Sequence, residues 1–495
     1  MRKKLQLLCS FLVIGVTYIQ AQTISGKIID EETQAPLPYT TIKYGENNGA
    51  ISNEEGDFNI TLTKQYTEKD SVYFSSIGYA TKALPLGKNI DTLIVLKPEA
   101  VELSSVYLTN EKLTADEIID RVEENLTKNY NKNYTKNRFF MRESFNQYYK
   151  KLNFQYKKSS IKEITKGLID SMISTIPKRT AFHNETLGDF YAKKDETNNK
   201  VTILKTSKLY NKNQEVSFEG LQDKFMEVLN KNVKKDSYLK IKSGLFGTKV
   251  SVDSIVNTAK NSEEIKDNYE QNNYFFSRKK SLTAMVNRLF YEEDSEVNVI
   301  HKSNRYDFVL EDYVFIEDNF CYVIAFTPGR FEDLGGKLYI NTEDFAVLRI
   351  DYKNTGLVYD KVFNMLGVNI NHMTFKGTMI FSKSTDNTYR LKYVSHTNGR
   401  SFKLDRPLTV IEKNKHVKGR RKQNELKLQM QFNIIDLNKK ELIVFDNNKV
   451  TNHEYNAIKE TKKVDVKYFS SYNADFWKGY NIIEPNQAIK EFTAF

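Results

Sequence analysis

Cysteine is scarce in this 495-residue chain, which contains only Cys9 and Cys321. Cys9 lies in an N-terminal stretch with the pattern of a secretory signal: the charged residues MRKK, an apolar run, and a small residue before an expected cut after Ala21. We therefore expect residues 1–21 to be a signal peptide. Cys321 alone would then remain, which excludes an intrachain disulfide and leaves packing as the source of stability.

Long apolar runs are also missing. After the N-terminal stretch, no segment approaches the roughly 18 consecutive apolar residues that a membrane-spanning helix needs, so the mature chain is expected to contain no transmembrane segment. Leu7 and Leu8 precede Cys9, where a lipoprotein anchor requires a small residue. The sequence therefore predicts an exported protein without a lipid anchor.

Recognisable catalytic and ligand-binding motifs are absent as well. There is no G-x-S-x-G nucleophile elbow and no H-E-x-x-H metal spacing. The segment LGGKLY imitates the end of a phosphate loop, but Leu338 stands where Ser or Thr must hold magnesium. Cys321 lies within an apolar run, where a thiol belongs to an inert core. We expect no catalytic residue, no metal ligand and no cofactor. A catalytic set that converges from distant strands, with His372 or His396, is the alternative.

Aromatic residues are abundant, because the chain contains 30 Tyr and 31 Phe but a single Trp. Flat rings suit the pleated faces of sheets, so this composition favours a β-rich protein. Short alternating segments separated by Gly and Pro, from TISGKIID to DTLIVLKP, predict a small β-sandwich over residues 22–100.

The loop GAISNEEGDFNI, residues 49–60, gathers three acids around Gly56. A calcium loop needs a bidentate acid six residues after its glycine, but that position is Leu62. The spacing instead predicts a turn, with Asn53 bonding to the backbone, Gly56 at a positive φ and Phe58 starting a strand.

The run ISGKIIDEETQAPLPYTTIKY, followed by GAISNEEGDF, SSIGY and LIVLKP, resembles the carboxypeptidase regulatory-like domain of Gram-negative envelope proteins, including the N-terminal extensions of TonB-dependent receptors. The resemblance implies a sandwich that serves as an interaction module and implies no peptidase. It also implies a location in the periplasm or at the outer membrane or cell surface, with an outer-membrane protein as a candidate partner.

Residues 101–134 are expected to form a linker and a docking helix. Thr114 and Glu117 form a capping box, and Ile118, Val122 and Leu126 recur on one helical face. Two further amphipathic helices are predicted downstream. The first places Ile164, Leu168, Met172 and Ile176 on one face and ends at Pro177, and the second uses Leu221, Phe225, Leu229 and Val233. A polar insertion near 252–275 precedes a short helix over KKSLTAMVNRLFY.

From Asn304 onward, successive alternating segments separated by EDN, NTED and TDN predict a meander of antiparallel strands. Such a sheet curls, and helices on its concave side leave an apolar trough. The run YVIAFTPGRFEDLGGKLYINTEDFAVLRIDY resembles the sheet of periplasmic lipoprotein carriers. Residues 135–495 are therefore predicted to form one α+β antiparallel-sheet domain.

The segment EKNKHVKGRRKQNE carries the densest positive charge. In an envelope its phosphate partners would be lipid head groups or lipopolysaccharide, whereas nucleic acid is not expected for an exported chain. The alternative is a solvated loop that keeps strand edges apart. The residues expected to contact an anionic surface are Lys413, Lys415, Lys418, Arg420, Arg421 and Lys422.

These observations predict a mainly β chain with an α+β part: an N-terminal transthyretin- or immunoglobulin-like sandwich, then a large antiparallel-sheet domain with several helices. The first functional hypothesis is a noncatalytic envelope protein that binds a lipid, a glycan or a membrane partner. A secreted hydrolase and a structural or assembly factor of the outer membrane are the two alternatives.

Overall fold

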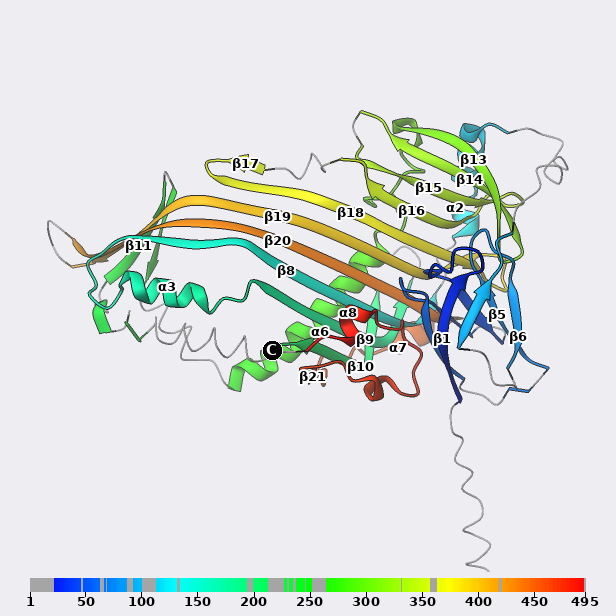
Figure 1. Cartoon of the computed structure of the whole chain (residues 1–495), viewed down its shortest axis with the longest axis horizontal. Coiled ribbons are helices and arrows are strands. Elements are labelled where there is room, and N and C mark those ends of the chain that lie inside the picture. The colour runs from blue at the N-terminus through cyan, green and yellow to red at the C-terminus, as the bar shows by residue number, and fades with distance from the viewer. Residues whose placement is uncertain are drawn as a thin grey trace, which may run out of the picture. The chain divides into compact units, whose positions relative to one another are not determined.

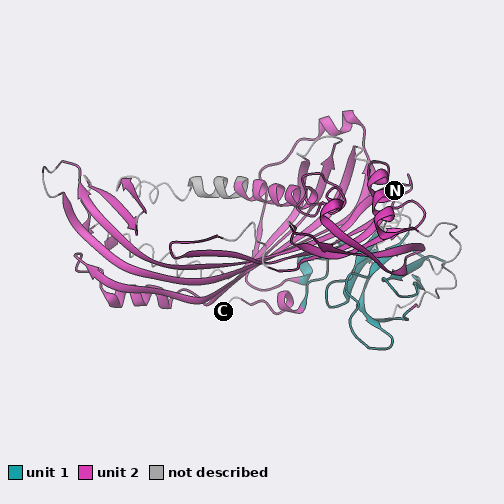
Figure 2. Ribbon diagram, turned by 90° about the horizontal axis from the view of Figure 1, so that it is seen from above, with its two compact units in different colours: residues 1–98, 474–486 teal, residues 99–473, 487–495 magenta. Residues whose placement is uncertain are grey.

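The computed structural model describes residues 22–493 apart from several short segments. The segments outside the description are 46–47, 63–65, 68, 87–91, 100–112, 131–133, 194–198, 212–226, 229–230, 235–236, 245, 252–263, 331, 357–362, 417 and 419–420. The chain divides into two compact units, coloured separately in Figure 2. Unit 1 contains residues 1–98 and 474–486, and unit 2 contains residues 99–473 and 487–495.

Unit 1 is a β-sandwich, as the sequence predicts. One sheet has the strand order β4–β1–β7 and the other has the order β3–β2–β5–β6. The strands are β1 (Gln22–Asp30), β2 (Thr41–Tyr44), β3 (Asn48–Ile51), β4 (Asp57–Leu62), β5 (Ser71–Ser75), β6 (Lys82–Pro85) and β7 (Leu93–Leu96). Phe58 of the first sheet meets Phe74 of the second edge to face, with ring centroids 5.4 Å apart. Alternate residues of both sheets therefore form one core.

The loop before β4 is the predicted turn. Gly56 has a φ of 76°, and the Oδ1 atom of Asn53 accepts hydrogen bonds from the backbone N–H groups of Glu55 and Asp57, both at 2.9 Å. A Cβ atom at Gly56 would lie 2.5 Å from the carbonyl oxygen of Ile28. Both the left-handed backbone and this close approach therefore require glycine here.

A segment from the far end of the sequence completes unit 1. It begins with the 3-10 turn η4 (Ala474–Trp477). The Oδ1 atom of Asn481 accepts the backbone N–H of Thr61 at 2.7 Å, and its Nδ2 atom donates to the hydroxyl of Tyr44 at 2.8 Å. The Nδ2 atom of Asn53 donates to the carbonyl of Pro485 at 3.2 Å. Side-chain amides thus satisfy polar groups of the sandwich that its own strands leave open.

Unit 2 is built on one 14-stranded sheet with the main order β13–β14–β15–β16–β18–β19–β20–β8–β9–β10–β21 (Figure 1). Neighbouring strands are antiparallel except for the pair β10 and β21, so the predicted meander and large antiparallel sheet are confirmed. The strands are β8 (Thr135–Ser159), β9 (Arg179–Ala192), β10 (Lys200–Tyr210), β11 (Ser237–Ser243), β12 (Phe246–Ser251), β13 (Tyr306–Ile316), β14 (Asn319–Pro328), β15 (Leu334–Asn341), β16 (Val347–Asn354), β17 (Phe363–Met365), β18 (Val368–Lys383), β19 (Tyr389–Asn414), β20 (Lys422–Lys449) and β21 (Lys467–Phe469).

Three central strands are unusually long: β8 has 25 residues, β19 has 26 and β20 has 28. Strands in globular proteins are commonly about five or six residues long. Figure 2 shows these strands curving and twisting together along their length. The long strands therefore connect two separate core regions, one near each end.

The first core region lies under helix α2 (Ala115–Asn129) and the C-terminal part of α6 (Glu264–Val286). Thr114 caps α2 in the predicted capping box with Glu117, and Ile118, Val122 and Leu126 are buried. The short helix predicted over KKSLTAMVNRLFY is the end of the 23-residue helix α6. The remaining short elements are η2 (Ser303–Arg305), α7 (Asn452–Ala457) and α8 (Gln487–Lys490).

The second core region lies under α3 (Lys166–Ser174), near the turn between β19 and β20. The helix and its end before Pro177 agree with the sequence, but the predicted face is wrong in part. Ile169 is buried and the half-buried Ile173 packs against the same core, whereas the half-buried Leu168 and Met172 are not part of it. The helix begins after its cap Thr165, whose side chain accepts a hydrogen bond from the backbone N–H of Leu168. The helix predicted over Leu221 to Val233 falls largely outside the described residues.

Candidate functional site

Between the two core regions, one pleated face of the sheet carries two rows of apolar side chains. Directly paired residues of antiparallel strands point to the same face, so the register defines each row. The first row is Phe363, Ile370, Phe402, Ile434 and Tyr149. The second row is Met365, Val368, Leu404, Phe432 and Leu152. We call these ten residues the apolar band; it crosses five adjacent strands, β17, β18, β19, β20 and β8.

A β-bulge places the side chains of β8 on the same face as the rest of the band. Ile434 pairs with Tyr149, but Asn433 pairs with Lys151, so Lys150 is an extra residue on β8. Without this bulge, strict alternation would place Tyr149 and Leu152 on opposite faces. The bulge therefore lets both residues extend the apolar band to a fifth strand.

The opposite pleated face of the same strands carries mostly hydrogen-bonding side chains. Gln429 and Gln431 donate to the carboxylate of Asp405 at 2.5 and 3.0 Å, and Asn153 donates to Gln431 at 3.4 Å. Neighbouring Asn369 and Asn371 are bonded at 2.8 Å. The two faces of this part of the sheet thus differ in chemistry, and the apolar band lies on one of them.

Solvent reaches the band mainly at its β17 end. Phe363 and Met365 are 44% and 52% exposed, and the other eight members are half-buried. Leu366, at the tip of the β17–β18 hairpin, is also exposed and has a φ of 52°, which is uncommon for a bulky residue. Large apolar side chains usually lie inside a monomer. The adjacent exposed side chains of Phe363, Met365 and Leu366 therefore indicate a contact surface.

Charged residues bound the band along the strands. On one side, Arg400 lies 3.9 Å from Asp436, which also accepts a hydrogen bond from Gln147 at 2.8 Å. On the other side, the guanidinium of Arg406 donates to the Oγ atom of Ser243 at 2.9 Å and lies over the ring of Phe246. The apolar surface is therefore finite and has polar borders.

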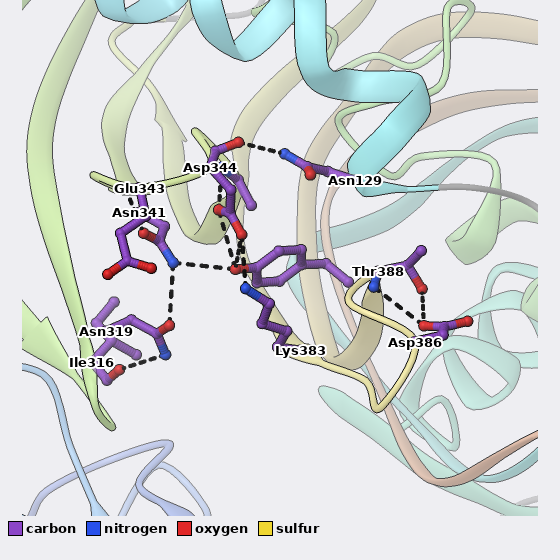
Figure 3. A network of polar contacts seen from close by, with 11 residues as sticks. Asn129, Ile316, Asn319, Asn341, Glu343, Asp344, Lys383, Asp386 and Thr388 are labelled. Atoms are coloured by element: carbon purple, nitrogen blue, oxygen red, sulfur yellow. Dashed lines mark hydrogen bonds and ion pairs between the residues drawn. The ribbon is translucent and has the colours of Figure 1, made fainter.

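Near α2, a polar network attaches the helix to the sheet (Figure 3). Asn129 donates to the carbonyl of Asp344 at 2.9 Å, and Lys383 lies 3.0 Å from the carboxylate of the same residue. Tyr389 donates to this carboxylate at 2.9 Å, and Asn341 donates to Tyr389 at 3.2 Å. Burial, followed by the charge of Asp344, raises the pKa of Tyr389. These groups bind one another, which indicates a structural role.

The basic residues predicted to contact an anionic surface lie at the turn between β19 and β20. Lys413 and Lys422 form the last residue pair between β19 and β20. Lys422 also forms an ion pair with Glu425 at 2.8 Å. Lys415, Lys418 and Arg421 lie in the turn or directly after it, and Arg420 falls outside the described residues. Their contact with an anionic surface stays a prediction.

The hydrolase alternative would use either His372 or His396. His396 is buried, and its Nδ1 atom lies 3.2 Å from the hydroxyl of Tyr352, while His372 is half-buried in a different cross-strand row. Cys321 is fully buried, and burial raises the pKa of its thiol to about 12. This thiol is therefore protonated at neutral pH, as expected for a core residue.

Residues 24–108 match the family model of the CarboxypepD_reg-like domain. The N-terminal resemblance is confirmed. No curated protein matches the chain. Among the described residues, no helix is both long enough and apolar enough to cross a membrane.

Several solved structures show a distant likeness. A putative outer membrane lipoprotein-sorting protein domain from Vibrio parahaemolyticus is 8% identical, with 69% of this chain and 97% of that chain covered and a TM-score of 0.22. A DUF1329 family protein from Desulfovibrio piger is 9% identical, with 66% and 92% covered and a TM-score of 0.19. MucB with MucA from Pseudomonas aeruginosa is 7% identical, with 68% and 99% covered and a TM-score of 0.17. Scores this low do not establish a shared fold.

The sequence did not identify the apolar band. Phe402, Leu404, Phe432 and Ile434 alternate with polar residues, which is a signal for a strand with one apolar face. Whether these residues lie in one row with Phe363 or Tyr149 depends on the register of five strands, which alternation alone does not determine. Among the features predicted from the sequence, the apolar trough is the one most similar to this surface.

Proposed function

We propose that this is a noncatalytic protein of the cell envelope whose large sheet binds the apolar part of an amphiphilic lipid. The observation that supports this proposal is the apolar band, with its two unbroken cross-strand rows and its polar borders. The N-terminal carboxypeptidase regulatory-like domain serves as the interaction module, with an outer-membrane protein as its candidate partner. The protein acts in the periplasm or at the outer membrane or cell surface.

The dimensions of the band fit a hydrocarbon chain. With neighbouring strands about 4.8 Å apart and same-face residues about 7 Å apart along a strand, the band is roughly 19 Å across and two side chains wide. A long, narrow apolar strip of this kind can accommodate an extended acyl chain. Complete burial of a side chain such as Phe363 or Met365 would contribute about 1.5–3 kcal/mol.

The position of the band favours a lipid over a protein strand as its occupant. A strand from a partner adds at a free sheet edge, where backbone N–H and C=O groups are available. Most of the band instead crosses the paired strands β18, β19, β20 and β8, whose backbone groups are engaged in the ladder, and only its β17 end lies on a strand with a single described neighbour. Recognition on this face therefore depends on apolar contact, which a hydrocarbon chain supplies without leaving polar groups unpaired.

A pair of adjacent residues provides a matched test. Ile434 belongs to the band, whereas Ile435 lies on the opposite pleated face, and both are half-buried in β20. We expect Ile434→Asn to weaken binding of an uncharged fluorescent hydrophobe by at least about tenfold, which corresponds to about 1.4 kcal/mol. Ile435→Asn should leave the affinity within about twofold, and circular dichroism would verify that both variants are folded.

Native mass spectrometry of the protein purified from its own envelope is the second test of lipid binding. A lipid released on denaturation from the wild-type protein, and reduced in Ile434→Asn, would support the proposal. A clean apo mass together with no hydrophobe binding would overturn it and favour the assembly-factor alternative. Equal losses in the Ile434 and Ile435 variants would show that the band is not the binding surface.

A further inference from the structure

A compact group of charged side chains lies on the same pleated face as the apolar band, where α6 covers the sheet. Lys440 of β20 lies 2.9 Å from Oε1 of Glu143 on β8 and donates to the Oγ atom of Ser281 on α6 at 2.6 Å. Arg278, also on α6, forms an ion pair with Glu143. We call Glu143, Arg278, Ser281 and Lys440 the Lys440 cluster.

The cluster has an excess of positive charge. Glu143 is the one carboxylate that pairs with both Arg278 and Lys440 within the described part of the chain. Arg288 adds a further positive field at Lys440, although it is itself paired with Glu296 at the surface. A buried cation without a full counter-charge is costly, and an anion beside it would offset that cost.

Unpartnered polar atoms surround the cluster. The Nε atom of Arg278 and the Oδ1 atom of Asn184 are buried without a hydrogen-bond partner among the residues described. Arg278 and Asn184 are 8% and 5% exposed. In the next cross-strand row, the Oδ1 atoms of Asn398 and Asn438 are likewise buried without a hydrogen-bond partner among the described residues. Each such atom costs about 1–3 kcal/mol if nothing binds it, so their concentration at one place points to a polar ligand.

The Lys440 cluster and the apolar band follow one another along the same strands. His396 and Lys440 form one row, Asn398 and Asn438 the next, and Arg400 and Asp436 the row before the band. Exposure rises in the same direction, because His396 is 4% exposed, Asn398 is half-buried and the Arg400 side chain is 53% exposed. About 14 Å of strand separates the Asn438 row from the Ile434 row, at roughly 3.4 Å per residue.

We infer that the Lys440 cluster, with Asn398 and Asn438, is a subsite for the anionic head group of the lipid whose apolar chain occupies the band. This inference rests on the proposed function. The ligand is an anionic amphiphile with an extended polar head, since a carboxylate attached directly to an acyl chain would have to lay that chain across two polar rows. Phosphate oxygens would accept from Lys440 and Arg278, and the asparagine side chains would bind hydroxyl groups of the head.

The protonation of Lys440 is consistent with such a site. Burial, followed by the charges of Arg278 and Arg288, lowers the pKa of the Lys440 amine to about 8. Burial also lowers the pKa of Arg278 to about 10. An anion bound between these two cations would favour their charged forms and reverse both shifts.

The test compares lipids that differ only in their head groups. Phosphatidylinositol 4-phosphate carries an anionic group at the far end of an extended head, and phosphatidylinositol lacks that group. Each lipid would be titrated against the fluorescent hydrophobe at constant ionic strength, and binding of inorganic phosphate would be followed by calorimetry. We expect phosphatidylinositol 4-phosphate to bind about tenfold more tightly than phosphatidylinositol. Lys440→Met should abolish this preference and leave phosphatidylinositol unchanged, whereas Lys440→Arg should retain it.

Lys439 provides the matched control. It is the adjacent residue, its side chain is similarly buried, and it forms an ion pair with Glu441 on the opposite pleated face at 3.0 Å. Lys439→Met should retain the head-group preference. Equal binding of the two lipids, or an unchanged preference in Lys440→Met, would overturn the inference while leaving lipid binding intact. Failure of both lipids to bind would instead overturn the proposed function. Binding of inorganic phosphate alone at the same affinity as phosphatidylinositol 4-phosphate would show an ion site that is independent of the band and would overturn the inference.

Discussion

At the scale of single residues, buried titratable groups couple the fold to pH. His183 lies on the opposite face of the sheet from the Lys440 cluster, where its Nδ1 atom is 2.9 Å from the hydroxyl of Ser144. Burial, followed by the charges of Arg142 and Arg179, lowers the pKa of His183 to about 4. The native state therefore holds this imidazole neutral where the unfolded chain would protonate it.

The sign of the pH effect follows from this shift. Between about pH 6.5 and pH 4, the unfolded chain binds a proton at His183 that the native chain does not, so the free energy of unfolding falls as the pH falls. The loss should reach up to about 3 kcal/mol, at about 1.4 kcal/mol per pH unit. Urea unfolding of the wild type and His183→Gln across this range would measure it. The variant should lack this part of the slope; parallel curves would contradict the assignment.

At the scale of strands, one glycine sets how tightly β16, β18 and β19 pack. A Cβ atom at Gly377 would lie 2.4 Å from the hydroxyl of Tyr352 and 2.3 Å from the carbonyl oxygen of Ser395. Tyr352 on β16 pairs with Gly377 on β18, and its ring passes over this glycine. The Tyr352 hydroxyl thereby contacts the Nδ1 atom of His396 on β19. The absence of a side chain at Gly377 therefore permits this contact across the sheet.

Gly377→Ala should lower the free energy of unfolding by about 1–3 kcal/mol, because Tyr352 or the backbone must move to accommodate the methyl group. Chemical denaturation would measure the change. Gly356→Ala is the control, since nothing lies within 4 Å of a Cβ atom at that position. An equally small effect of both substitutions would show that Tyr352 moves without cost.

Alternation in the sequence predicted most strands, and capping chemistry predicted the start of α2. Each of these signals is local, because it depends on residues within a few positions of one another. The face of α3 was predicted wrongly in part, since its contact surface is set by the strands under Ile169 and Ile173. The apolar band and the Lys440 cluster depend on cross-strand register and on the bulge at Lys150, which no local pattern specifies.

At the scale of the whole chain, a distant segment stabilises unit 1. Asn481 bonds both the backbone N–H of Thr61 and the hydroxyl of Tyr44. Nothing in the pattern of residues 474–486 indicates which strands this segment meets. The sandwich strand β4 therefore depends on residues more than 400 positions away.

Asn481→Ala should cost about 1–3 kcal/mol, because it leaves the N–H of Thr61 without its acceptor. Hydrogen exchange would show the effect as faster exchange in β4, with β20 of unit 2 unchanged. Asn486→Ala is the matched control from the same segment, since Asn486 bonds the exposed Glu54. Equal exchange of β4 in the wild type and Asn481→Ala would contradict this role.

The long central strands also constrain the order in which the chain can fold. β8 is flanked by β9, which follows it closely, and by β20, which lies almost 300 residues later in the sequence. One edge of β8 stays unpaired until nearly the entire chain has emerged, and contacts so distant in sequence form slowly. Before β20 is available, an exposed edge of 25 residues is a site for incorrect pairing with other chains. The sheet architecture thus makes protection of β8 during biogenesis as important as the stability of the finished fold.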